Sequence, residues 1–253
     1  MPETISPQLA TLVGKPPSGE NWLHEIKLDG YRIIAFKHGK QVRLMSRNNK
    51  DWTTKFQTIM KAIEKIPITR LILDGEIVLF DEQNRSSFQL LQNALDSDDN
   101  SPFIYYVFDL LYYDKWDVRS LSLLDRKALL EPLLTSKIPN LHFSDYILGE
   151  GKEIFAYACD LGLEGIVSKF ATSTYITRRS KSWLKVKCLK RQEFVIGGFS
   201  PPKNSRNCFG SLFLGLYDKE GNFIYNGNVG TGFSEASLRA IYEELKNTLL
   251  LKT

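Results

Sequence analysis

Apolar and polar residues alternate over several short segments of the chain, and this alternation predicts half-buried β-strands. In residues 22–30 (WLHEIKLDG) it places Glu25 and Lys27 on one face and Ile26 and Leu28 on the other. Residues 31–47 predict a hairpin whose turn contains a glycine. Further strands are predicted over residues 71–80, 103–113, 164–170 and 182–188.

Other segments repeat their apolar residues at helical spacing. Phe56, Ile59, Ile63 and Ile66 predict a helix over residues 52–66, which Pro67 ends. Shorter helices are predicted over residues 88–95, 121–134 and 154–161, and a longer amphipathic helix over residues 234–250. The chain is therefore predicted to be an α+β protein.

The composition divides the chain into three parts. Residues 1–20 are rich in Pro, Gly and Ser and predict an extended arm along the surface. Residues 21–191 form the predicted α+β domain. From residue 192 to residue 253 the sequence is Gly-rich and β-like, with about three strands and one helix. Three strands and one helix are marginal for independent stability, and we therefore expect this module to be stabilised by packing against the larger domain.

The overall composition is that of an ordinary globular protein. Of the 253 residues, 43% are hydrophobic and 25% are charged, which excludes a disordered, collagenous or coiled-coil chain. The net charge of +4 is too small to indicate a nucleic-acid partner by itself. We expect no secretory signal, no membrane span and a cytosolic location. The three cysteines are far apart and form no CxxC pair, so neither a disulfide framework nor a structural zinc site is expected.

One lysine has the surroundings of a nucleophile. Lys27 begins the string KLDGYR at the end of the first predicted strand. A lysine that faces inward beside Glu25 can attack an electrophile when burial and neighbouring cations favour loss of its proton. Gly30 permits a sharp turn next to a ligand. The alternative is a hairpin corner with Lys27 and Arg32 in solvent, which the string alone does not exclude.

Acidic residues interrupt two otherwise apolar strands. Asp74 and Glu76 project from one face of residues 71–80, and a buried carboxylate there needs a partner or a metal ion. Glu164 begins the apolar segment EGIVSKF. The alternatives are an exposed edge strand for the first two residues and a solvated loop for the third.

The densest run of positive charge lies near residue 185. Such a run can bind the phosphates of a nucleotide or of a duplex, and its alternative is a solvated basic face. Lys185 and Lys187 alternate with apolar residues and share one face, which favours phosphate binding. Phe108 lies on the strand predicted over residues 103–113, and the simplest interpretation of its side chain is packing in the core. The run comprises Arg178, Arg179, Lys181, Lys185, Lys187, Lys190 and Arg191.

Six segments, taken in chain order, resemble the motifs of the nucleotidyltransferase superfamily of ATP-dependent ligases and capping enzymes: HEIKLDGYR, LMSRNN, LDGEIV, YYVFDLL, EGIVSK and WLKVKC. Longer phrases, such as PQLATLV, RSSFQLLQNAL and WLKVKCLKRQEFVIGGFSPPK, are similar to the ligase module of bacterial ligase D, an end-joining enzyme. The resemblance implies an adenylation domain of antiparallel sheets with flanking helices over residues 21–191. It also implies an OB-fold domain over residues 192–253 that lacks its last strands and a final basic motif.

The resemblance also implies a role for each candidate residue. Lys27 would take AMP from ATP as a phosphoramide, after losing its proton. The ATP site would further comprise Glu25, Ile26, Arg32, Arg47, Glu76, Phe108, Lys185 and Lys187, with Phe108 stacked on adenine and both lysines on the α-phosphate. Glu164 would bind Mg²⁺ or Mn²⁺, with Glu76 close to the metal. Asn49 stands where the family usually has glycine, and asparagine tolerates the left-handed backbone that this position needs.

The implied function is ATP-dependent sealing of nicks or breaks in duplex DNA, in repair by end joining. DNA would contact Arg178, Arg179, Lys181, Lys190 and Arg191. We expect a monomer that is associated with the nucleoid and works with a Ku-like protein and separate polymerase or nuclease modules. The alternatives are an impaired ligase remnant that binds nicked duplex without turnover, an RNA ligase, and a capping-type guanylyltransferase.

Overall fold

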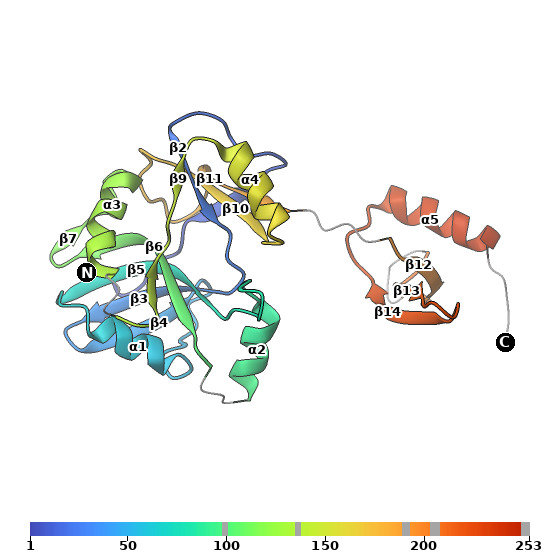
Figure 1. Cartoon of the computed structure of the whole chain (residues 1–253), viewed down its shortest axis with the longest axis horizontal. Coiled ribbons are helices and arrows are strands. Elements are labelled where there is room, and N and C mark those ends of the chain that lie inside the picture. The colour runs from blue at the N-terminus through green and yellow to red at the C-terminus, as the bar shows by residue number, and fades with distance from the viewer. Residues whose placement is uncertain (98–100, 135–137, 189–192, 203–207, 249–253) are drawn as a thin grey trace. The chain divides into compact units, whose positions relative to one another are not determined.

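The computed structural model describes residues 1–97, 101–134, 138–188, 193–202 and 208–248 (Figure 1). The chain divides into two compact units, Met1–Leu189 and Lys190–Thr253. The division lies close to Arg191, where the composition of the sequence changes.

A six-stranded sheet forms one half of the larger unit (Figure 1). Its strands follow the order β4-β3-β5-β6-β7, all antiparallel, and β8 lies parallel to β6. Leu71, Leu73 and Ile77 of β5 face a core that is closed by helices α1 (Gln57–Glu64) and α2 (Phe88–Asp96). The strands are β3 (Tyr31–His38), β4 (Gln41–Ser46), β5 (Arg70–Val78), β6 (Ile104–Tyr113), β7 (Trp116–Asp117) and β8 (Leu141–Phe143).

A five-stranded sheet forms the other half, in the order β1-β11-β10-β2-β9. Helix α4 (Gly151–Asp160) lies beside this sheet, and Ala158 of the helix packs on Ile166 and Val186 (Figure 1). The β10–β11 and β10–β2 pairs are antiparallel, whereas β1 runs parallel to β11. The strands are β1 (Leu9–Leu12), β2 (Trp22–Ile26), β9 (Ile147–Leu148), β10 (Gly165–Phe170) and β11 (Arg179–Lys187).

The predicted surface arm of residues 1–20 is partly interior. Strand β1 is a member of the five-stranded sheet, and Gln8 just before it is fully buried. The Gln8 N–H donates to Tyr175 Oη at 2.9 Å, and its side-chain oxygen accepts from Ile176 N at 2.8 Å. These hydrogen bonds satisfy the buried amide, so this glutamine is fixed in the interior.

The two sheets meet around a second hydrophobic cluster, in which Phe108 of β6 contacts Trp183 of β11 edge-on. Tyr175 and Ile72 belong to the same cluster. Helix α3 (Leu123–Leu130) and the 3-10 helix η1 (Glu131–Leu134) follow β7. One continuous helix was expected over residues 121–134, but Pro132 lies inside η1 and cannot donate the hydrogen bond that an α-helix requires.

The helix expected over residues 52–66 is also shorter in the structure. Helix α1 begins at Gln57, because the preceding residues form a turn instead. Thr53 N donates to Asp51 Oδ1 at 2.8 Å, and Thr53 Oγ1 accepts from Leu44 N at 2.9 Å. Both bonds compete with helix formation, as short polar side chains commonly do.

The smaller unit contains the three strands and the helix that the sequence predicts. Strands β12 (Val195–Phe199), β13 (Leu212–Tyr217) and β14 (Phe223–Val229) form an antiparallel sheet, followed by helix α5 (Glu235–Thr248). Its core joins Phe209 and Leu212 to Leu238 of α5. In neither unit does a described helix have the length and apolar character needed to cross a membrane.

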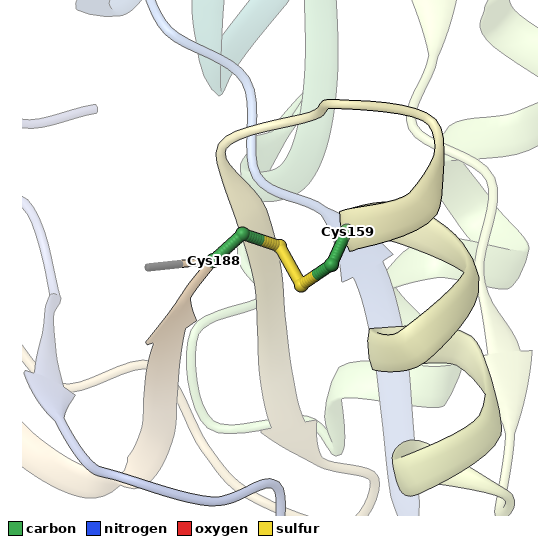
Figure 2. The surroundings of a disulfide bond; sticks show 2 residues. All are labelled: Cys159 and Cys188. Atoms are coloured by element: carbon green, nitrogen blue, oxygen red, sulfur yellow. A yellow bond between two sulfur atoms is a disulfide. The ribbon is translucent and has the colours of Figure 1, made fainter. Parts of the chain in front are cut away.

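The expectation of no disulfide is wrong. Cys159 of α4 and Cys188, directly after β11, form a disulfide bond with their Cα atoms 5.4 Å apart (Figure 2). They are 29 residues apart in sequence, but the β10–β11 hairpin between them returns the chain to the end of α4. Cys208 is half-buried and free.

Candidate active site

Lys27 lies where β2 leaves the five-stranded sheet. Its backbone N–H donates to the Gly165 carbonyl of β10 at 2.9 Å, which fixes the point of exit. On β2 the carboxylate of Glu25 is buried and Ile26 is exposed, the reverse of the usual hydrophobic pattern. The chain then turns at Gly30, where a Cβ atom would lie 2.1 Å from the Ile77 carbonyl oxygen, so that only glycine fits.

Glu164 forms ion pairs with two lysines, Lys27 and Lys187. Its Oε2 is 2.5 Å from Lys27 Nζ, and its Oε1 is 2.9 Å from Lys187 Nζ. Burial raises the pKa of this carboxyl, but hydrogen bonds from both ammonium groups more than compensate and leave the pKa below its ordinary value. Gly165 follows with φ of +141°, and a Cβ atom there would lie 2.0 Å from the Val186 carbonyl oxygen. The glycine therefore brings Glu164 close to β11.

Arg32 lines the pocket and forms an ion pair with Asp74, which does not line it. Its Nε and Nη2 donate to the two oxygens of Asp74, each at 2.6 Å, and Tyr175 Oη donates to Asp74 Oδ2 at 2.6 Å. Burial disfavours the Arg32 charge, but Asp74 outweighs it and raises the guanidinium pKa. The guanidinium lies 4.6 Å from the ring centroid of Phe108, so Asp74 fixes Arg32 against the aromatic wall.

A buried charge cluster lies at the inner end of the pocket. Glu25 Oε1 is 2.8 Å from Lys127 Nζ, and Glu25 Oε2 is 2.8 Å from Lys169 Nζ. Ser144 Oγ also donates to Oε2, at 3.1 Å. Burial lowers the pKa of Lys169 to about 8 despite the attraction of Glu25. The Lys169 ammonium also lies 4.1 Å from the ring centroid of Phe108.

These groups surround a pocket of about 220 Å³ between the two sheets. It brings together eight of the predicted ATP-site residues: Glu25, Ile26, Lys27, Arg32, Arg47, Glu76, Phe108 and Lys185. Glu164 and Lys187 do not line this pocket. Glu164 contacts the pocket residue Lys27, and Lys187 contacts Glu164. Arg32, Arg47 and Glu76 also border a neighbouring cleft of about 410 Å³.

Like Arg32 and Lys169, the pocket residues Glu76 and Lys185 have shifted pKa values. Burial raises the pKa of Glu76 to about 7, although Arg32 and Lys27 favour its charged form. Burial, together with Lys27 and Lys187, lowers the pKa of Lys185. Asn49 has φ of +57°, the left-handed conformation expected where the family has glycine.

The predicted DNA-contacting residues are only partly described. Arg178, Arg179 and Lys181 are exposed. Arg179 also lines the pocket and donates a hydrogen bond to the Ala10 carbonyl of β1. Lys190 and Arg191 lie outside the described residues.

Several pocket residues were missed by the sequence reasoning. Lys169, Ser144 and Trp183 line the pocket, as do Leu9 and Ala10 of the supposed arm. For Lys169 a signal existed, because it alternates with Val167 on β10 and both face the pocket. A lysine within an otherwise apolar strand must have a polar partner if it is buried, so its presence indicates a polar site on that face of the strand.

Comparisons with known proteins identify the family of the chain. The family model for the ATP dependent DNA ligase domain matches residues 7–187, and the model for the ATP dependent DNA ligase C terminal region matches residues 205–252. The chain belongs to the ATP-dependent DNA ligase family. The predicted fold class, a nucleotidyltransferase-type ligase domain followed by an OB-fold region, is therefore confirmed.

Relatives within this family include end-joining ligases. The chain is 45% identical over 249 residues to the multifunctional non-homologous end joining protein LigD of Pseudomonas aeruginosa, covering 97% of this chain and 30% of that protein. The ligase domain of Mycobacterium tuberculosis LigD is 32% identical in sequence with a TM-score of 0.66, covering 96% of this chain and 78% of that one. A mycobacterial DNA ligase D complexed with ATP is similar, with a TM-score of 0.66, 31% identity and coverage of 96% and 78%. The chain spans about a third of the length of the LigD relatives that it matches.

Proposed function

We propose that this chain is the catalytic module of an ATP-dependent DNA ligase that seals breaks in duplex DNA during end joining. One observation carries the proposal. The Lys27 amine lies at a pocket of nucleotide-binding character and contacts Glu164, with Lys185 and Lys187 close by. A nucleophilic amine beside fixed positive charge suits transfer of a nucleotidyl group, because charge builds on the phosphate as the bond forms.

In the first step the Lys27 Nζ attacks the α-phosphorus of ATP, the bond from that phosphorus to the pyrophosphate oxygen breaks, and pyrophosphate leaves. The amine must lose its proton before it attacks, because only the neutral form has a free electron pair. Lys185 and Lys187 neutralise the α-phosphate. The AMP then passes from Lys27 to the 5′-phosphate of the broken strand, and the 3′-hydroxyl displaces it to form the phosphodiester.

The buried charge cluster supports a preference for adenine. Adenine presents a donor, its 6-amino group, beside an acceptor, its ring nitrogen N1. The carboxylate of Glu25 accepts and the ammonium of Lys169 donates, and both line the pocket together with Phe108. Guanine presents the reverse order, so a guanine held in the same orientation would place its O6 acceptor against Glu25 and its N1–H donor against Lys169. We therefore propose that Glu25 and Lys169 select ATP over GTP, which disfavours a capping-type guanylyltransferase.

A divalent cation fits the same corner of the site. Glu164 and Glu76 offer carboxylate oxygens, the donors that Mg²⁺ and Mn²⁺ prefer. Lys27 lies near both carboxylates, because it contacts Glu164 and favours the charged form of Glu76. When bound, the cation would supply further neutralisation of the phosphates. Glu164 and Glu76 would hold it.

The DNA substrate is proposed to contact the exposed Arg178, Arg179 and Lys181 of the larger unit, with Lys190 and Arg191 nearby in sequence. The relatives named as multifunctional end-joining proteins support a role at broken ends. We propose that the chain acts at the nucleoid as a monomer, with a Ku-like protein and separate polymerase or nuclease modules as partners.

The test is the mass of the intact protein after incubation with ATP and Mg²⁺. Wild type is expected to gain one AMP, and Lys27→Ala is expected to gain none. Lys61→Ala, an exposed lysine of α1, is the matched control and should behave as wild type. An adduct of equal yield in Lys27→Ala would refute the assignment of the nucleophile.

Nick sealing then separates the alternatives. A DNA ligase joins an all-DNA nick, an RNA ligase prefers a nick with ribonucleotides, and GTP in place of ATP tests the capping-type alternative. If the chain binds nicked DNA but seals neither an ordinary nor a pre-adenylated one, the impaired remnant is the better description.

A further inference from the structure

The disulfide joins the two segments that carry Glu164 and Lys187. Cys159 belongs to the last turn of α4, five residues before Glu164, and Cys188 is the residue directly after Lys187. Figure 2 shows the two side chains pointing toward one another, from the end of the helix and from the end of the strand. The disulfide is therefore close in the chain to both members of the ion pair between Glu164 and Lys187.

A chain of short contacts connects the disulfide to Lys27. The Cys188 N–H donates to the Glu164 carbonyl at 2.9 Å. Lys187 Nζ contacts one carboxylate oxygen of Glu164, and Lys27 Nζ contacts the other. The disulfide thus closes a loop, containing β10 and β11, at the point where Glu164 and the end of β11 meet.

Oxidants and thiols in solution can reach this bond. Cys159 and Cys188 are both half-buried rather than enclosed, and Tyr157 and Leu161 beside Cys159 are well exposed. Lys187, next to Cys188, keeps 48% of its side chain exposed. The thiolate is the form of a cysteine that reacts in thiol–disulfide exchange.

We propose that Cys159 and Cys188 are a reversible redox modification site that sets how firmly Glu164 and Lys187 are held. In the dithiol form, one thiolate attacks a small-molecule disulfide such as oxidised glutathione and releases one small thiol. The second protein thiolate displaces the other small thiol and forms the bond between Cys159 and Cys188. The two protons of the protein thiols end on the two small thiols, so the exchange is balanced; excess small thiol reverses it.

The oxidised form is the better ordered one at Glu164. In the dithiol form the β10–β11 pairing remains, but the end of β11 is no longer tied to α4. A misplacement of 1 Å in an active site can cost on the order of a hundredfold in rate, and the surviving strand pairing keeps the displacement smaller. We expect reduction to slow adenylation of Lys27 by about threefold to tenfold. This consequence rests on the proposed function, whereas the exchange chemistry does not.

The first measurement counts free thiols. The full chain is equilibrated in glutathione buffers of stepped redox ratio, alkylated, and weighed intact. Oxidising buffers should leave Cys159 and Cys188 joined and unalkylated, with Cys208 either alkylated or carrying one glutathione, which the intact mass distinguishes, and reducing buffers should leave three reactive thiols. If three thiols react in every buffer up to fully oxidised glutathione, the proposal is overturned.

The second measurement is hydrogen–deuterium exchange of residues 164–168 and 184–188, with no ATP present. These amides should exchange more slowly in the oxidised protein, and Cys159→Ser should match the reduced wild type in both buffers. Cys208→Ser is the control and should keep the redox difference of wild type. Equal exchange of the two redox forms would overturn the proposed link to Glu164 and Lys187.

Adenylation is measured last on the same samples. A rate difference between oxidised and reduced wild type that is absent in Cys159→Ser supports the link to the active site, and equal rates contradict it. If exchange depends on redox state but neither form gains AMP, the proposed function fails and the redox site stands.

Discussion

Replacing Asp74 by asparagine should reveal how Arg32 is positioned. Asp74 is fully buried and receives two hydrogen bonds from Arg32 and one from Tyr175, each of 2.6 Å. Asparagine keeps the shape but loses the negative charge. The Arg32 side chain, 18% exposed, then lacks its counter-ion. Removing one partner of a buried ion pair costs about 3–5 kcal/mol, and partial exposure places this variant near 3 kcal/mol.

A second buried pair in the same unit provides the matched control. Arg126 donates to the two oxygens of Asp109 at 2.7 and 2.8 Å, and both side chains are fully buried. Neither residue lines the pocket. Asp109→Asn should therefore lose about 3–5 kcal/mol of unfolding free energy and weaken nucleotide binding less than Asp74→Asn does, because Asp109 acts on the pocket only through the charge of Lys169.

The two variants should separate in ATP affinity. Arg32 lines the pocket, and hydrogen bonds to charged groups are worth about 1.5–3 kcal/mol, so a misplaced Arg32 should weaken ATP binding by about tenfold or more. Urea unfolding gives the stability of each variant, and calorimetric titration with ATP gives the affinity. If Asp74→Asn binds ATP as tightly as Asp109→Asn does, Asp74 does not position Arg32 and the reasoning fails.

Three further predictions concern charge. Burial raises the pKa of Glu76 to about 7, and only the ionised form can hold the divalent cation proposed above. The affinity for ATP in the presence of Mg²⁺ should therefore rise from pH 6 to pH 8, and titrations of Glu76→Gln should lose that rise. Burial lowers the pKa of His24, whose Nδ1 lies 2.8 Å from Ser168 Oγ. The unfolded chain therefore takes up a proton at His24 near pH 6.5 that the folded chain resists, whereas the raised pKa of Glu76 has the opposite effect on stability over the same range. The difference between variants isolates the histidine: as the pH drops from 7.5 to 5.5, the free energy of unfolding of wild type should fall relative to that of His24→Gln, and an unchanged difference would contradict the reasoning. The affinity for nicked DNA should fall as the salt concentration rises, because binding releases counterions from the phosphates. The double variant Arg178→Ala/Lys181→Ala removes two proposed phosphate contacts and should reduce the slope of log affinity against log salt by about 2, whereas Lys61→Ala should leave the slope unchanged.

The strands of the pocket were predictable because alternation is a local property. The pattern of residues 22–30 predicts the strand that carries Glu25 and leads to Lys27, although Ile26 and Leu28 of the opposite predicted face line the pocket as well. Glu76 and Phe108 also lie on strands that the sequence predicts, β5 and β6. The order of the motifs then indicated which of these residues belong together.

Proximity between distant segments was not predictable in this way. The pairing of Cys159 with Cys188 depends on where the β10–β11 hairpin returns, which spacing in the sequence does not specify. Strand β1 has only four residues between segments rich in Pro and Gly, so local composition hides it. Lys169 was overlooked because its counter-ion, Glu25, belongs to another strand.

The pairing of β1 with β11 also has a consequence during protein synthesis. Gln8 and Tyr175 contact each other across 167 residues of sequence, and Leu9 and Ala10 form part of the pocket wall. A ribosome adds about 5–20 residues per second, so roughly 8–33 s separate the synthesis of these two partners. Until β11 emerges, β1 has no neighbour and the wall of the nucleotide pocket is incomplete. A nascent chain stalled before residue 179 should therefore fail to retain ATP, although most of the residues that line its pocket have already been made.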